Sequence, residues 1–316
     1  MMLKICNLKK SYGKIRALRD LNLEIEDGEL FGFVGPNGAG KTTTIRILTG
    51  LLRADSGTVE IDGQPMRCGD GKLKEKIGYV PDFFGVYDNV RVSEYLEFYA
   101  SAYGITGLVA RRRYMELLDM VGLGGREDHY VDSLSRGMKQ RLGVARALVH
   151  NPRLLILDEP AAGLDPRTRQ DFIQMLKEIN KCGKTILISS HILSELGEMC
   201  TDIGIIEEGA MVLRGSLVDI LAMVNTSNPL EMRIYKNLPE AVALLRRHPL
   251  VHNVTIDGNQ VVAGFSGGQM DEARLLGQLV TEAGALVGSF GRRQGGLESV
   301  FMQITGSKEE KVVAQG

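Results

Sequence analysis

The sequence predicts an α/β fold followed by a smaller α+β domain. Continuously apolar runs at 30–34, 154–158 and 185–190 have the character of strands that are buried on both faces of a parallel sheet. Segments with helical spacing of apolar residues lie between these runs, so strands and helices alternate. After residue 222 the pattern changes, and a new series of strands and helices follows a polar linker at 225–229.

The bulk composition is that of an ordinary globular protein of 316 residues, with 44% apolar and 24% charged residues. Lys and Arg (38) nearly balance Asp and Glu (39), which disfavours a protein that acts on nucleic acid. The four cysteines lack metal-ligand spacing and indicate reduced thiols. No signal peptide begins the chain, and no stretch approaches the ~18–20 apolar residues of a spanning helix. We therefore expect a cytoplasmic protein that reaches a membrane only through a partner.

The elements of the first domain can be predicted in order. Strands are expected at 3–7, 21–26 and 30–34 and within 57–80. Helices are expected from the end of a glycine-rich loop to about Gly50, across 91–122, and from Met138 to Val149.

The second domain shows the order βαββαβ. The expected elements are a strand at 231–236, a helix at 239–248, strands at 251–256 and 260–265, a helix at 271–283, a strand at 286–290 and a closing helix at 297–304. This order fits a ferredoxin-like fold. We expect domains at 1–222 and 223–316, the second one regulatory or dimerising.

A phosphate-binding loop follows the apolar strand at 30–34. Residues 35–42, GPNGAGKT, fit the pattern G-x(4)-G-K-[ST] between a strand and a helix. Glycines let backbone N–H groups approach phosphates, Lys41 adds charge at the β- and γ-phosphates, and the Thr42 hydroxyl suits Mg²⁺. The residues expected around the nucleotide are Gly35, Asn37, Gly38, Ala39, Gly40, Lys41, Thr42 and Thr43. This loop alone does not separate a kinase, a GTPase and a transport ATPase.

Two carboxylates end the apolar strand at 154–158. Asp158 is placed to hold Mg²⁺, and Glu159 to orient or deprotonate the attacking water. The alternative is a strand that simply ends in solvated acids. The phosphate loop earlier in the chain favours the catalytic interpretation.

A third motif, LSRGMKQR at 134–141, gives the class of ATPase. Its Ser135 lies 23 residues before Asp158. With the phosphate loop and the acidic pair in this order, residues 1–222 resemble the ABC ATPase family, in which a signature LSGGQ caps the nucleotide of the opposite subunit. Ser135 and Gly137 match that signature, whereas Arg136 and Met138 replace a glycine and the glutamine. The form LSRGMKQR looks like the exporter branch with separate membrane subunits.

The resemblance implies further site residues. Asp165 lies in the family's D-loop (163–166), which crosses the dimer interface. His191 matches the family's switch histidine, which contacts the γ-phosphate. Tyr12 matches the aromatic residue that stacks on adenine. Asp82 stands where the family usually has glutamine; aspartate can ligate Mg²⁺, but it is shorter and charged, so a direct contact with the metal stays open.

The resemblance also implies a function and partners. It predicts a P-loop NTPase domain with a helical subdomain that binds ATP and Mg²⁺ and hydrolyses ATP. Two such units, as a homodimer, would drive an exporter with separate polytopic transmembrane subunits, from the cytoplasmic face of the cell membrane. The alternative is a soluble ABC ATPase that acts on the ribosome or nucleic acid, but such proteins normally carry two ATPase units per chain. No nucleic acid is expected as a partner, and no residue reports the cargo.

Half of the chain's Phe and Tyr residues lie between 79 and 114. The list is Tyr79, Phe83, Phe84, Tyr87, Tyr95, Phe98, Tyr99, Tyr103 and Tyr114. Aromatic residues gather in cores and at interfaces alike. This cluster is therefore either helical core or part of a groove that receives the membrane subunit.

Overall fold

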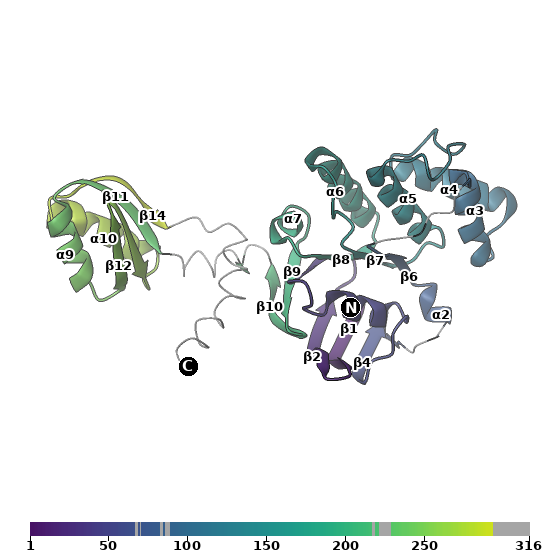
Figure 1. Cartoon of the computed structure of the whole chain (residues 1–316), viewed down its shortest axis with the longest axis horizontal. Coiled ribbons are helices and arrows are strands. Elements are labelled where there is room, and N and C mark those ends of the chain that lie inside the picture. Colours follow the sequence, from purple (N-terminus) through teal and green to yellow (C-terminus); the bar gives the residue numbers. More distant parts are fainter. Residues whose placement is uncertain are drawn as a thin grey trace. The chain divides into compact units, whose positions relative to one another are not determined.

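The computed structural model describes residues 1–66, 69, 71–82, 85, 89–216, 219–220 and 229–292. The chain divides into two compact units, Met1–Leu217 and Val218–Gly316, which are described separately (Figure 1). The sequence placed this boundary at residue 222.

A six-stranded sheet forms the centre of the first unit, in the order β10-β9-β3-β8-β7-β6. Its strands are β3 (Leu30–Val34), β6 (Ile77–Val80), β7 (Leu154–Asp158), β8 (Thr185–Ser190), β9 (Asp202–Glu207) and β10 (Ala210–Ser216). All pairings from β9 to β6 are parallel, whereas β10 runs antiparallel to β9. Every residue of β3, β7 and β8 is buried, as their apolar sequences predict.

A smaller antiparallel sheet, in the order β2-β1-β4-β5, packs below the central one (Figure 1). Its strands are β1 (Leu3–Tyr12), β2 (Ile15–Ile25), β4 (Ser56–Ile61) and β5 (Gln64–Pro65). Helix α1 (Lys41–Leu48) shares one apolar core with both sheets, in which Ile45 and Leu48 join Phe31 and Phe33 of β3. Because α1 is packed in this core, the loop that precedes it is held at a fixed place on the sheet.

The remaining helices of the first unit are α2 (Gly71–Lys74), α3 (Val92–Ala102), α4 (Gly107–Met120), α5 (Arg136–Leu148), α6 (Pro166–Lys181) and α7 (Leu193–Gly197). The helical region expected at 91–122 is two helices, because Gly104 between them and Gly107 at the start of α4 adopt positive φ angles of 75° and 62°. Helices α3, α4 and α5 lie together at one end of the central sheet, as the predicted helical subdomain (Figure 1).

The second unit has the predicted βαββαβ order. It comprises β11 (Leu230–Lys236), α9 (Leu238–Arg247), β12 (Val251–Asp257), β13 (Gln260–Phe265), α10 (Gln269–Thr281) and β14 (Leu286–Arg292). The antiparallel sheet order β12-β13-β11-β14 completes a ferredoxin-like arrangement. Alternate residues of β11, Leu230, Met232 and Ile234, share the core with Leu245 of α9 and Leu275 of α10. The closing helix expected at 297–304 lies outside the described residues.

Candidate functional site

The phosphate loop joins β3 to α1, as predicted. Gly38 and Gly40 have φ angles of 84° and 110°, which non-glycine residues rarely adopt. A Cβ atom at Gly35 would lie 2.3 Å from the Ile206 carbonyl oxygen of β9. The glycines therefore let the loop turn tightly and lie directly against the neighbouring strand.

Lys41 is the buried cation of this site, with 6% of its surface exposed. Its Nζ donates to the Gly35 carbonyl oxygen at 2.7 Å and lies 3.3 Å from Glu159 Oε1. A buried ammonium needs such partners, since desolvation disfavours its charge. Nucleotide phosphates that enter the loop would compete with Glu159 for this cation.

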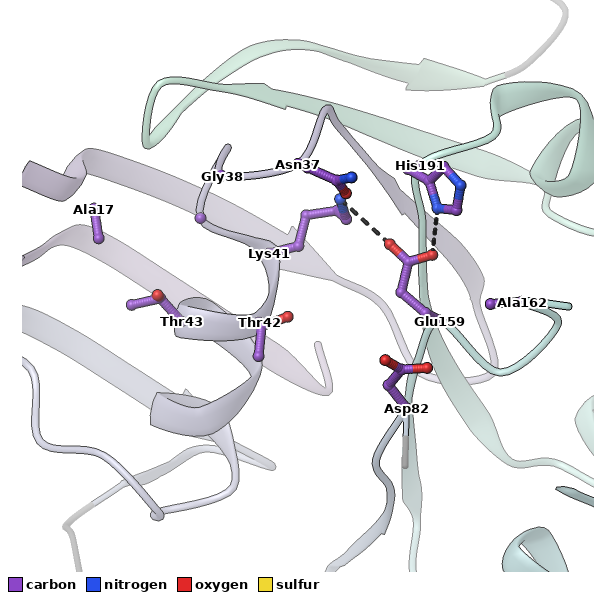
Figure 2. Close-up of a pocket in the computed structure, with 11 residues that line it drawn as sticks. Ala17, Asn37, Gly38, Lys41, Thr42, Thr43, Asp82, Glu159, Ala162 and His191 are labelled. Atoms are coloured by element: carbon purple, nitrogen blue, oxygen red, sulfur yellow. Dashed lines mark hydrogen bonds and ion pairs between the residues drawn. The ribbon is translucent and has the colours of Figure 1, made fainter. Parts of the chain in front are cut away.

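Glu159 lies between two basic groups (Figure 2). While Oε1 faces Lys41, Oε2 is 2.6 Å from His191 Nδ1. The backbone of Glu159 has a φ of 50°, an uncommon conformation for a non-glycine residue. Its N–H donates to Ser189 Oγ at 3.0 Å, which helps to hold the carboxylate at the edge of the sheet.

Asp158 is 2% exposed and accepts a 2.6 Å hydrogen bond from Ser189 Oγ. Burial raises the pKa of Asp158, hydrogen bonds from Ser189 and Thr42 oppose that rise, and the nearby Glu159 and Asp82 carboxylates add to it. This excess of negative charge and the oxygen donors fit a hard divalent cation such as Mg²⁺, which uses few protein ligands and completes its shell with phosphate and water. Within the described ranges, no group of three or more His, Cys, Asp or Glu has metal-binding geometry.

These groups surround one pocket of about 360 Å³, within the range of about 300–1,000 Å³ that is usual for small-molecule sites. Its lining residues are Ala17, Asn37, Gly38, Gly40, Lys41, Thr42, Thr43, Asp82, Glu159, Ala162 and His191. The structure thus brings together most of the predicted phosphate loop with Asp82, Glu159 and His191. Ala17 and Ala162 were not predicted, and neither was the contact of Ser189 with Asp158 and Glu159.

Seven predicted residues do not line this pocket: Tyr12, Gly35, Ala39, Ser135, Gly137, Asp158 and Asp165. Gly35 and Ala39 are buried within the loop, and Asp158 is buried at the end of β7. Tyr12 ends β1 with its ring 46% exposed, so the ring is accessible to a ligand.

Ser135 and Asp165 each begin a helix. The Ser135 hydroxyl accepts from the Met138 N–H at the start of α5, and the Asp165 carboxylate accepts from the Thr168 N–H at the start of α6. Hydrogen bonds from Thr168 hold the pKa of Asp165 below its usual value. The two helix starts approach closely, since a Cβ atom at Gly137 would lie 2.4 Å from Thr168 Cγ2.

Three features define a P-loop ATPase site: a glycine-rich loop with a buried lysine after β3, an acidic pair at the end of β7, and a histidine after β8, the strand between them. Residues 18–162 match the family model described as ABC transporter. The chain belongs to the family of ABC transporter ATP-binding proteins, which confirms the resemblance seen in the sequence.

Relatives match nearly the whole chain. The linearmycin resistance ATP-binding protein LnrL of Bacillus subtilis is 32% identical over 96% of this chain and 98% of its own length. The bacitracin transport ATP-binding protein BcrA of Bacillus licheniformis is 35% identical over 96% and 97% of the two chains. Among solved structures, a dimeric post-hydrolysis state of the ATP-binding cassette MJ0796, bound to ADP and Pi, is 30% identical with a TM-score of 0.62. It covers 68% of this chain and 99% of its own.

Family membership establishes the activity. The chain binds ATP and hydrolyses it as the ATPase of a transporter, as its sequence predicts. The alternative of a soluble ATPase on ribosomes or nucleic acid is not favoured by these relatives. Across the described part of the chain, no helix combines the length and hydropathy needed to cross a bilayer.

The described part of the aromatic region divides between core and surface. Tyr95 and Tyr114 are buried, whereas Phe98 and Tyr103 are 59% and 40% exposed. Phe83, Phe84 and Tyr87 lie outside the described residues. The core interpretation therefore holds for Tyr95 and Tyr114, whereas a contact of the exposed rings with a membrane subunit stays a prediction.

His150 is packed under this region. Its ring stacks on Tyr103 with centroids 3.9 Å apart, and Nε2 lies 3.0 Å from the Ile77 carbonyl oxygen, to which it donates as Nε2–H. Nδ1 is buried without a hydrogen-bond partner in the described structure. Burial is the main cause that lowers the pKa of His150 from 6.5.

The stability of the protein should therefore fall in mild acid. As the pH drops below about 6.5, the unfolded chain protonates His150 before the folded one does, which removes stability by at most about 1.4 kcal/mol per pH unit. His150→Gln keeps a donor for Ile77 and should flatten this dependence between about pH 7 and pH 5. Urea unfolding followed by circular dichroism, repeated across this pH range, gives the change in unfolding free energy with pH for the wild type and for His150→Gln. The same pH dependence in both proteins would show that His150 is not the titrating group.

Proposed function

We propose that this chain powers an exporter by ATP-driven pairing of two copies, coupled to separate transmembrane subunits at the cytoplasmic face of the membrane. The observation that carries the proposal is the position of Glu159, held between Lys41 and His191 in the pocket of the phosphate loop. The direction of transport rests on LnrL and BcrA, whose names record antibiotic resistance and bacitracin transport.

Within one copy, the phosphate loop and Lys41 bind the β- and γ-phosphates. Thr42 and Asp158 would hold Mg²⁺, Asp82 lines the same pocket, and the ion would neutralise charge on the phosphates. Glu159 orients the attacking water and accepts its proton, and His191 contacts the γ-phosphate while it fixes the Glu159 carboxylate. The exposed ring of Tyr12 stacks on adenine.

The opposite face of each nucleotide is bound by the second copy. Ser135 and the backbone at Gly137 offer a hydroxyl and helix N-terminal N–H groups to the γ-phosphate of the partner's ATP. Asp165 of the D-loop crosses at the same interface. ATP then binds the closed pair better than the open one and shifts the population toward closure, and loss of the γ-phosphate reverses the shift.

The membrane subunit contacts the aromatic surface beside β6. A pocket of about 220 Å³ there is lined by Leu51, Tyr79, Tyr99, Tyr103, His150 and neighbouring residues. The exposed side chains of Leu51 and Phe98 stand at the surface of the same unit. Exposed aromatic and aliphatic side chains of this kind are enriched at protein interfaces. The role of residues 223–316 as a regulatory or dimerising domain stays a prediction.

Phe98→Ser should reduce co-sedimentation of the chain with its native membranes at least about fivefold, since truncation of an aromatic hot-spot residue that a partner covers costs more than about 1 kcal/mol. Binding of ATP should be unchanged. Val212→Ser is the matched control, an exposed apolar side chain on β10 at the other end of the central sheet. Equal sedimentation of both variants and the wild type would refute this docking surface.

A further inference from the structure

Arg136 is the first residue of α5, directly between Ser135 and Gly137. A cation at this position is unfavourable, because the N-terminus of a helix already carries partial positive charge. The structure shows a specific contact that offsets this cost. Arg136 Nη2 donates to the carbonyl oxygen of Ala162 at 2.7 Å.

The loop at 162–165 is shaped to receive the guanidinium group. Gly163 has a φ of 69°, and a Cβ atom on it would lie 2.6–2.9 Å from the guanidinium atoms of Arg136. The group therefore occupies space that a side chain at 163 would need. Gly137 and Thr168 meet at the starts of α5 and α6, so packing joins the two helices, and the hydrogen bond of Arg136 joins α5 to the loop that precedes α6.

This contact continues to the catalytic pocket. Ala162 lines that pocket beside Glu159, and its N–H donates to the Glu159 carbonyl oxygen at 3.1 Å. The side chain of Glu159 in turn contacts Lys41 and His191. A short series of contacts thus leads from Arg136 through the backbone at 162 to the residue that activates water.

We propose that Arg136 is a positioning residue, which ties the signature segment of a subunit to the Glu159 of that same subunit. The inference rests on the proposed pairing, in which the signature of one copy binds the ATP of the other. When Ser135 engages the partner's nucleotide, Arg136 holds Ala162 and Gly163 in the arrangement that places Glu159 for attack on the copy's own nucleotide. The two ATP sites are coupled through this side chain.

Hydrogen exchange tests whether Arg136 holds the loop at 162–165, and it needs neither nucleotide nor pairing of two copies. In the full chain, Arg136→Ala should accelerate exchange of the amides at 162–165 at least about fivefold, because the charge-assisted hydrogen bond that holds this loop to α5 is lost. Exchange at 35–42 should not change, and Arg136→Lys, which keeps one donor, should fall between. Lys139→Ala is the control, since Lys139 is also a cation on α5 that donates to a carbonyl, that of Asp132, away from this loop. Unchanged exchange in Arg136→Ala would overturn the proposal.

Mixed dimers test the direction of the coupling. Two differently tagged copies are purified together, one of which carries Glu159→Gln, so that a single site hydrolyses ATP. Arg136→Ala in the copy that keeps Glu159 should lower kcat about tenfold with little change in KM, as expected when a catalytic group is misplaced. The same change in the Glu159→Gln copy should lower kcat less than about twofold.

The opposite pattern would contradict the proposal. A loss confined to Arg136→Ala in the Glu159→Gln copy would show that Arg136 acts directly on the partner's phosphate. A failure of the two copies to pair in ATP would instead contradict the proposed function, and it would leave the hydrogen-exchange result as it stands.

Discussion

Glu159→Gln should lower the rate of ATP hydrolysis at least about 100-fold while ATP binding is retained. Glutamine has the size of glutamate and its amide can remain beside His191, but it has no charge and cannot take a proton from water. Loss of the carboxylate also removes a competitor for Lys41, so that the affinity for ATP should stay the same or rise. Phosphate release and binding of a fluorescent ATP analogue measure the two effects separately.

Glu178→Gln is the matched control for this change. Glu178 is an exposed carboxylate on α6 that pairs with Lys181, and its loss should leave hydrolysis unchanged. Normal hydrolysis by Glu159→Gln would show that another group activates the water, and the assignment of Glu159 would be wrong.

Lys41→Ala should weaken ATP binding at least about 100-fold, since the variant loses a desolvated cation at the β- and γ-phosphates. The effect is enlarged because the Glu159 carboxylate, 3.3 Å from Lys41 Nζ, would then face the phosphates without the charge of the lysine. Hydrolysis should fall with binding. Isothermal titration with ATP gives the change in affinity, and circular dichroism checks that the variant is folded.

A surface lysine provides the comparison for this variant. Lys181→Ala removes an exposed cation on α6 and should bind ATP as the wild type does. If Lys41→Ala bound ATP with unchanged affinity, the loop at 35–42 would not be the phosphate site.

Much of the fold could be predicted from the sequence because its central strands are uniformly apolar. The runs at 154–158 and 185–190 coincide with β7 and β8. Strands β9 and β10 and helix α6 were not assigned. The apolar part of β9 is short, and its place beside β3 depends on pairing with residues far away in the chain. That pairing is what makes Gly35 necessary, since its neighbour is Ile206.

The site residues could be predicted where a motif contains charged or polar residues of known reactivity. Asp82, Glu159 and His191 follow neighbouring parallel strands, so their side chains meet the phosphate loop at one edge of the sheet. The part played by Ser189 depends on the register that pairs it with Asp158, which a sequence does not reveal. Ala17 and Ala162 line the pocket, but alanine has no charged or polar side-chain group by which a sequence pattern could single it out. Ser135, Gly137 and Asp165 stay predictions, because the role proposed for them is at the ATP site of a second copy.

The molar mass of the Glu159→Gln chain in solution, measured by light scattering with MgATP and with MgADP, tests ATP-driven pairing most directly. The account predicts the mass of a single chain, 34.6 kDa, in ADP and a doubled mass in ATP. An unchanged mass in ATP, with ATP shown to be bound, would contradict it.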